Sequence, residues 1–128
     1  MPVVRISVRK GSFSPREKNE MLNAVHCALV EALKIPNHDR TQVLGEYEDF
    51  EIPPGKGEKY TLIEISMFSG RSKETKRALF GKIVENLEPI GIPPLEVFIV
   101  LNEQPRDNWG IRGGRQASDL DLGFKVDV

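Results

Sequence analysis

Proline at position two is the residue whose type and place in the chain could most directly do chemistry. The chain begins Met1-Pro2, and the apolar run from Val3 to Val8 predicts a buried strand that Pro2 opens. A proline donates no N–H to a sheet, so a functional role would lie in its nitrogen. If an aminopeptidase removes Met1, Pro2 presents a secondary amine, and an α-amino group titrates at about 7.7–8.0 before its surroundings shift it. Retention of Met1 would leave an amide nitrogen without a basic lone pair.

Two charged side chains stand at junctions between expected elements. Arg71 precedes Ser72, the expected cap of a helix, and a guanidinium beside the open N–H groups of a first helical turn is suited to holding a carboxylate. The alternative for Arg71 is a solvated surface arginine. Asp39 follows the Ile35-Pro36 turn and precedes a strand, where it could serve chemistry or simply cap a short helical turn.

The Gly-rich segment from Gln104 to Ser118 is expected to be irregular and carries the single tryptophan, Trp109. Tryptophan in such a loop is typical of a subunit interface. Arg112 and Arg115 flank a glycine pair, which favours anion recognition or a salt bridge. A lone Arg-Gly-Gly copy in a near-neutral chain is weak support for RNA binding.

The remaining reactive side chains predict neither a metal centre nor a nucleophilic triad. His26 flanks an apolar helical stripe and is expected in the core, while His38 lies in a turn. Cys27 is the single cysteine, which excludes an internal disulfide and any multi-cysteine metal site. No phosphate-binding glycine motif or nucleophile elbow is present. We therefore expect no metal and no other cofactor.

Composition describes one ordinary globular domain of 128 residues, with 39% hydrophobic and 29% charged residues. A net charge of −1 supplies no basic field for nucleic acid or an anionic membrane. No stretch is apolar enough to span a bilayer, and the start lacks the regions of a signal peptide. We expect neither nucleic acid nor membrane as a partner, and a cytoplasmic location is the default.

The elements that must position these residues form a pattern that occurs twice, over approximately residues 2–48 and 60–103. Each copy has an alternating strand, a glycine, a capped amphipathic helix, an Ile-Pro pair and a second strand. Ser14, Pro15 and Glu17 mark the first helix start as a capping box. The apolar stripes are Met21, Leu22, Val25, Ala28, Leu29, Ala32 and Leu33 in the first helix, and Leu79, Ile83, Val84 and Leu87 in the second.

A helical crossover of this length favours parallel pairing of the two strands in each copy. Two copies predict an α+β, two-layer fold with a four-stranded mixed sheet and both helices on one face, in a single domain over 1–128. The other face stays uncovered, so we expect the chain to bury it against copies of itself. Within the C-terminal segment 104–128, aspartates alternate with leucines, and residues 120–128 are expected to return as a short edge strand.

A Met-Pro start followed by two β-α-β repeats of this length resembles the tautomerase superfamily. The more specific matching stretches are Ile35-Pro36-Asn37-His38-Asp39-Arg40, Ser69-Gly70-Arg71-Ser72 and Asn108-Trp109-Gly110-Ile111-Arg112-Gly113-Gly114. They are most similar to the malonate semialdehyde decarboxylase branch and to uncharacterised tautomerase-like proteins of similar length. The resemblance implies a homotrimer and an amino-terminal proline that acts as catalytic acid or base.

The resemblance also implies roles for individual residues. Pro2 and Asp39 would be catalytic, with Asp39 assisting the proline or activating water. The substrate-binding residues would be Arg71, Trp109, Ile111 and Arg112, of which Trp109 and Ile111 line the wall of the site. One departure matters, because the decarboxylases carry two arginines before the second helix and the first of those positions here is Ser69.

These observations predict a tautomerase that moves a proton within a small 2-oxo or enol carboxylic acid. Arg71 would hold the carboxylate or enolate, and neutral Pro2 would act as base and then as acid. The alternative enzyme is a decarboxylase or hydratase of a 3-oxo acid such as malonate semialdehyde, in which protonated Pro2 polarises the carbonyl. A Pro2 pKa well below about 7 favours the tautomerase, and one well above favours the alternative. A non-catalytic trimeric binding protein is the third hypothesis.

Overall fold

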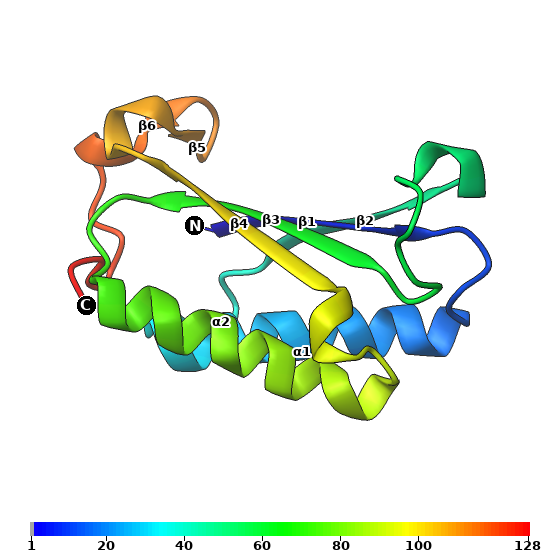
Figure 1. Cartoon of the computed structure of the whole chain (residues 1–128). Helices are drawn as coiled ribbons and strands as arrows, with labels where there is room; N and C mark the ends of the chain where they lie inside the picture. Colours follow the sequence, from blue (N-terminus) through cyan, green and yellow to red (C-terminus); the bar gives the residue numbers. More distant parts are fainter. Residues whose placement is uncertain (1) are drawn as a thin grey trace.

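The structure is a computed structural model and describes residues 2–128. A sheet forms one layer, and two long helices cover a single face of it (Figure 1). The elements are β1 (Pro2–Arg9), α1 (Pro15–Leu33), β2 (Thr41–Tyr47), β3 (Thr61–Phe68), α2 (Lys73–Leu87), β4 (Val97–Gln104), β5 (Gly110–Ile111) and β6 (Arg115–Gln116). The two β-α-β repeats and the two-layer α+β fold expected from the sequence are confirmed.

The sheet runs in the order β2-β1-β3-β4, with parallel pairs at its two sides and an antiparallel pair in its centre. Pro2 lies opposite Met67 in the central pair, and Val3 lies opposite Thr41 at the start of β2. Phe68 lies opposite Gln104 at the end of β4. The starts of β1 and β2 and the ends of β3 and β4 therefore share one end of the sheet, which we call the site end.

Local capping signals begin both helices where the sequence predicts. The Ser14 side chain accepts a hydrogen bond from the Glu17 backbone N–H, and the Glu17 carboxylate accepts one from the Ser14 N–H at 2.8 Å, which completes a capping box. Ser72 caps α2 by accepting from the backbone N–H of Thr75 at 3.1 Å. These caps fix the turns that precede the helices, and Arg71 lies in one of those turns.

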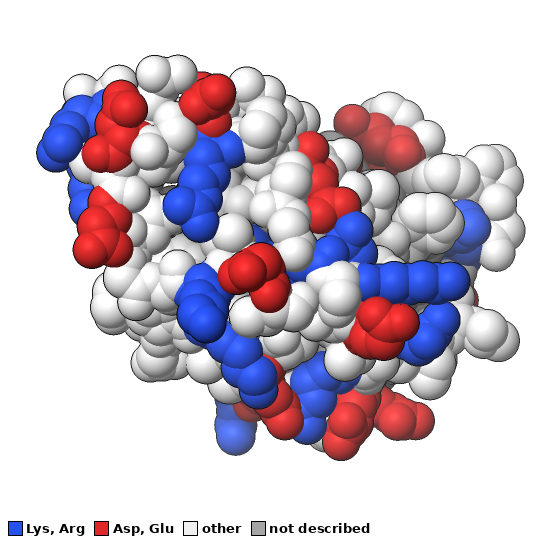
Figure 2. Space-filling model, turned by 90° about the vertical axis from the view of Figure 1, so that its left-hand side faces the viewer, with Lys and Arg blue, Asp and Glu red and all other residues white. Residues whose placement is uncertain are grey.

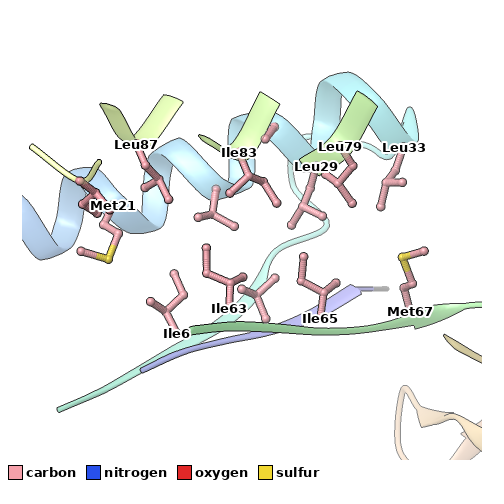
Figure 3. Close-up of a cluster of buried hydrophobic side chains, with 14 of the residues drawn as sticks. Ile6, Met21, Leu29, Leu33, Ile63, Ile65, Met67, Leu79, Ile83 and Leu87 are labelled. Carbon is pink, nitrogen blue, oxygen red and sulfur yellow. The ribbon is translucent and has the colours of Figure 1, made fainter. Parts of the chain in front are cut away.

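The core lies between the helices and the sheet (Figure 3). Alternate residues of β1 and β3 point to the helices, and each helix packs an apolar stripe against them. The largest side chains with at most 1% exposure include Ile6, Met21, Leu29, Leu33, Ile63, Ile65, Met67, Leu79, Ile83 and Leu87. Full burial of such a side chain contributes about 1.5–3 kcal/mol, so this layer supplies the main stabilisation of the fold.

The expectation of an edge strand over residues 120–128 is wrong, because the structure forms no strand there. The Asp121 carboxylate accepts a hydrogen bond from the Gly123 N–H at 3.0 Å, and Gly123 has a φ of 76°, so a turn interrupts the extended run. The segment instead crosses the site end, where Val126 packs against Phe68 and the Val128 carbonyl accepts from the Ser72 N–H at 2.9 Å.

The Gly-rich segment also has more order than expected. Its centre is a small hairpin in which β5 pairs with β6 in antiparallel fashion. Short 3₁₀ turns at Arg106–Asn108 and Ala117–Asp119 flank this hairpin. The hairpin projects beyond the site end of the sheet (Figure 1). No helix within residues 2–128 is long and apolar enough to cross a membrane.

Candidate active site

Pro2 occupies the first position of β1 and is buried at the site end. Its pairing with Met67 brings the amino-terminal start of the chain beside the end of β3, which comes from the second repeat. The position therefore matches the expectation that Pro2 sits on the first residue of a sheet. Met1 lies outside the described residues, so the state of the Pro2 nitrogen stays a prediction.

Arg71 follows β3 and is buried, with only 5% of its surface exposed. One guanidinium nitrogen, Nη1, donates to the Phe68 carbonyl at 3.2 Å. The other two nitrogens, Nε and Nη2, are buried without a hydrogen-bond partner among residues 2–128. The alternative of a solvated surface arginine is therefore wrong. Buried, open donors on a charged group are costly to the fold, and a bound anion would satisfy them.

The surroundings of Arg71 are mixed in charge. Burial lowers the pKa of the Arg71 guanidinium below its usual value, because the charged form loses solvent. The Glu103 carboxylate opposes this effect on the pKa, and the positive charge of Arg106 reinforces it. Asp39 also opposes it, which places Asp39 within electrostatic reach of the same guanidinium. Seen from this end, basic and acidic side chains are interspersed, without a large patch of one sign (Figure 2).

Asp39 is half-buried where the chain enters β2. It lines a cavity of about 250 Å³ together with Arg40, Thr41 and Arg112. Phe124, in the segment that crosses the site end, also lines this cavity. Its backbone N–H donates to the Pro36 carbonyl at 3.0 Å within a turn. The structure thus brings Asp39 to the site end, in a position open to small molecules.

Trp109 packs against the end of β3 and is half-buried. Its ring meets the Phe68 ring edge to face, with centroids 5.0 Å apart and planes at 72°. Its indole Nε1 donates to the Gln104 carbonyl at 3.5 Å. Ile111 joins the same cluster from β5. Both residues therefore belong to the apolar cluster around Phe68, and their role as the wall of the site stays a prediction.

Two family profiles, both described as tautomerase enzyme, match this chain, one over residues 39–112 and the other over residues 2–52. The chain belongs to the tautomerase family. The two matches together start at Pro2 and reach the hairpin that carries Trp109 and Arg112.

Individual relatives agree with this membership. The probable tautomerase YusQ of Bacillus subtilis (strain 168) is 25% identical over 123 residues, which cover 90% of this chain and 96% of that protein. A 2-hydroxymuconate tautomerase of Comamonas testosteroni is 39% identical over 51 residues, or 39% of this chain and 81% of that shorter protein. The second match has about the length of one repeat, which agrees with the tandem organisation of this tautomerase.

Solved structures share the fold over most of the chain. FG41 malonate semialdehyde decarboxylase superposes with a TM-score of 0.81 at 32% identity, covering 91% of this chain and 92% of that one. A native fused 4-OT has a TM-score of 0.82 at 21% identity and covers 92% and 98% of the two chains. The four-stranded sheet with two helices on one face is thus the tautomerase fold.

Arg112 differs in placement from the other expected site residues of this tautomerase. It is exposed at the tip of the hairpin with a φ of 51°, a left-handed conformation that is uncommon for a residue with a side chain. It reaches the cavity on the Asp39 side. Arg71, Trp109 and Ile111 gather around the end of β3 instead.

His26 and Cys27 do not line the cavity beside Asp39, whereas His38 does. His26 has 3% exposure, and its Nε2 lies 2.7 Å from the Asn37 carbonyl, so it is the core histidine expected from the sequence. His38 is exposed in its turn, and Cys27 is exposed on α1. No group of three histidine, cysteine or acidic side chains within residues 2–128 is suited to holding a metal ion.

Three charged residues near Arg71 escaped the sequence analysis. Glu103 points inward from β4 and forms an ion pair with Lys76 of α2 at 2.5 Å. Arg106 places its guanidinium over the Phe68 ring, with 5.8 Å to the centroid. A signal for Glu103 was available, since it continues the inward-facing alternation of Val97, Ile99 and Leu101 with a charge. Arg106 lies in a turn and has no such signal.

Proposed function

We propose that this protein catalyses proton transfer in a small 2-oxo or enol carboxylic acid, interconverting keto and enol forms. The observation that carries the proposal is that Pro2 and Arg71 lie at the same end of the sheet, since Pro2 pairs with Met67 and Arg71 donates to the Phe68 carbonyl. Pro2 supplies a potential amine base, and Arg71 supplies two buried donors that lack a partner among residues 2–128. Family membership supports the same reaction class.

The reaction requires that Met1 is removed, which leaves the Pro2 nitrogen as a secondary amine. Arg71 holds the substrate carboxylate or its neighbouring carbonyl oxygen through Nε and Nη2. Neutral Pro2 takes a proton from the carbon next to the carbonyl, and the electron pair of that C–H bond forms the enolate. The protonated amine then returns the proton to oxygen or to another carbon, and the amine is regenerated.

The surroundings of the two groups fit these tasks. The guanidinium of Arg71 stabilises the negative charge that develops on the enolate oxygen, which is the larger electrostatic contribution. Trp109, Ile111 and Phe68 form an apolar cluster at the same end of the sheet, and apolar surroundings would favour the neutral form of the amine. In this proposal Asp39, which lines the cavity at the same end of the sheet, assists the amine. All of these steps use groups of the chain itself and need no cofactor.

We also propose that the active form is a homotrimer. The sheet face that the helices leave uncovered carries Val3, Val43, Phe98 and Val100, whose exposed fractions run from 37% to 57%. Contact between copies would remove this apolar surface from water. A fused 4-OT with a TM-score of 0.81 to this chain forms a symmetric trimer.

A 3-oxo acid decarboxylase or hydratase is the alternative candidate, because FG41 malonate semialdehyde decarboxylase is a relative at 32% identity. That chemistry would use protonated Pro2 to polarise the carbonyl while carbon dioxide leaves. An NMR titration of the Pro2 nitrogen separates the two, since a pKa well below about 7 supports the tautomerase and one well above supports the decarboxylase.

The decisive experiment is an ultraviolet assay with phenylenolpyruvate and 2-hydroxymuconate on the wild type and on Pro2→Ala, each with its amino terminus verified by intact mass. We expect turnover by the wild type and a loss of at least about a hundredfold in kcat/KM for Pro2→Ala, because general acid–base catalysis is worth about 10²–10⁴-fold. Pro89→Ala, at an exposed proline, is the matched control and should keep wild-type rates.

Absence of turnover in Met1-free wild type would overturn the tautomerase proposal, and 3-oxo acid decarboxylation would then be assayed. If neither reaction is detected, the third hypothesis, a non-catalytic trimeric binding protein, gains support. Sedimentation or light scattering tests the trimer separately, and a monomer at micromolar concentration would contradict it.

A further inference from the structure

Arg106 lies on the short turn that follows β4, at the same end of the molecule as Arg71. Its guanidinium carbon lies 5.8 Å from the centre of the Phe68 ring. Arg71 Nη1 donates to the backbone carbonyl of that same Phe68 at 3.2 Å. Phe68 therefore contacts two guanidinium groups, that of Arg71 through its backbone carbonyl and that of Arg106 through its ring.

Neither guanidinium forms an ion pair with a carboxylate among residues 2–128, although Glu103 and Asp39 both oppose the lowering of the Arg71 pKa. Arg71 Nε and Nη2 have no hydrogen-bond partner, and Arg106 forms no side-chain ion pair or hydrogen bond with these residues. Glu103 is the carboxylate with the strongest effect on Arg71, but Lys76 already binds it at 2.5 Å. The positive charge of Arg106 is one cause of the lowered pKa of Arg71.

Two like charges held together beside an apolar cluster repel each other more strongly than in water, because solvent screens them less. An anion bound between them would relieve the repulsion and satisfy the open donors of Arg71. The position that a second arginine occupies in the decarboxylase branch is Ser69 here, and its side chain is exposed. Arg106 is the second guanidinium that the structure brings to Phe68.

We propose that Arg106 is the second cation of the anion site and binds the substrate carboxylate together with Arg71, in place of the arginine that Ser69 does not supply. The identification of that anion as a substrate carboxylate rests on the proposed function. The site thus uses one guanidinium before α2 and one after β4, converging on Phe68. A monocarboxylate such as a 2-oxo acid is the ligand that two guanidinium groups beside an apolar wall would take.

Trp109 provides a direct readout of binding, because it is the single tryptophan and its ring lies 5.0 Å from that of Phe68. The experiment titrates pyruvate into the protein and follows Trp109 fluorescence, which needs no turnover. We expect Arg106→Gln to weaken pyruvate binding about tenfold and Arg71→Gln about a hundredfold, as hydrogen bonds to charged groups and buried charge pairs predict. Arg115→Gln, at an exposed arginine of the neighbouring hairpin, should stay within about twofold of wild type.

Two further variants separate a charge contact from a structural role. Arg106→Lys keeps the charge and should retain most of the affinity. Adding Ser69→Arg to Arg106→Gln places a cation in the position used by the decarboxylase branch and should recover at least half of the lost affinity on a logarithmic scale. Pyruvamide, which lacks the carboxylate charge, should bind wild type and Arg106→Gln equally weakly.

Pyruvate binding by Arg106→Gln with wild-type affinity would overturn the inference, as would a loss that neither Arg106→Lys nor Ser69→Arg recovers. The failure of the proposed function is a different result. In that case pyruvate binding would still depend on both Arg71 and Arg106, while Pro2→Ala would leave turnover unchanged or the wild type would show none.

Discussion

The two ends of the sheet are built by the same repeat but treat their polar groups in opposite ways. At the site end, Pro2 opens β1 and Arg71 precedes α2 with buried donors that lack a partner among residues 2–128. At the other end, which we call the closed end, Thr61 opens β3 and Ser12 lies in the turn before α1. The same strand-turn-helix junction therefore occurs twice, and the copy at the site end carries the residues of the proposed active site.

The closed end pairs most of its polar groups internally. Arg9 Nε there is buried without a hydrogen-bond partner among residues 2–128, but it lies 2.9 Å from the Asp49 carboxylate in an ion pair. The Thr61 hydroxyl is fully buried and donates to the Lys59 carbonyl at 2.9 Å. The Ser12 hydroxyl donates to the Glu58 carbonyl at 2.9 Å. Lys59 donates to the Ser12 carbonyl and lies 4.4 Å from the centre of the Phe13 ring. At the closed end most hydrogen-bond donors have partners, which stabilises the fold. At the site end two donor nitrogens of Arg71 lack partners among residues 2–128, which leaves them free to bind a ligand.

The largest effect that would sharpen this comparison comes from Arg71→Met. This change removes the buried guanidinium while keeping an unbranched apolar chain in its place. We expect kcat/KM for keto–enol conversion to fall by about 10²–10³-fold, since one donor to a developing oxyanion is worth that much. Thermal denaturation should show stability equal to or above wild type, because an uncompensated buried charge is costly. Strong destabilisation with retained activity would show that Arg71 is structural.

The next largest effect concerns the free energy of unfolding and the glycines in the turns before α2 and α1. Gly70 has a φ of 131°, and an added Cβ would lie 3.3 Å from the Val126 carbonyl oxygen. Gly11, its counterpart at the closed end, has a φ of 82° and nothing within 4 Å of an added Cβ. We expect Gly70→Ala to cost about 2–3 kcal/mol and Gly11→Ala about 1 kcal/mol in the free energy of unfolding. Urea denaturation measures both, and equal costs would contradict the role of the Val126 contact.

A smaller effect tests the closed end alone. Thr61→Val keeps the shape of the buried side chain but removes the donor to the Lys59 carbonyl. The loss should be about 1 kcal/mol of unfolding free energy, the usual net value of such a hydrogen bond. Turnover should not change, because Thr61 lies at the end opposite Pro2. A fall in kcat/KM without a change in stability would mean that the closed end takes part in the reaction.

The smallest effect concerns the two helix starts at low pH. Hydrogen bonds from Ser14 hold the pKa of the Glu17 carboxyl below its ordinary value of 4.5. The contribution of this cap is therefore complete above about pH 4.5 and is lost as the pH falls through the lower folded-state value. Glu17→Gln should lose less stability than wild type between pH 6 and pH 3 in urea denaturation. The α2 start has Thr75 at this position, so its cap should not respond.

Much of this architecture follows from local sequence signals. Alternating apolar residues and the caps at Ser14 and Ser72 predicted the strands, both helices and the turn that holds Arg71. Pro2 could be found because it stands at the first position of a strand. These features depend on a few neighbouring residues, which is why the sequence alone was enough for them.

The parts that could not be predicted depend on contacts between distant segments. The Lys76–Glu103 pair joins α2 to β4, and Arg106 meets Phe68 only because β3 and β4 end together in the sheet. The segment 120–128 was assigned by its alternation, but the turn that Asp121 makes with Gly123 redirects it across the site end. These contacts depend on which segments lie side by side in the folded chain, and the residue types alone do not show this.

The central pairing of β1 with β3 should form late during folding. Each repeat can close its own parallel strand pair through its own helix, but Pro2 meets Met67 only after both repeats exist and join. Contacts between distant residues form slowly, because the loop entropy must be lost first. During refolding, helical signal should therefore return before the Trp109 environment and before turnover. A chain halted between these stages would have most of its backbone structure and no capacity to react.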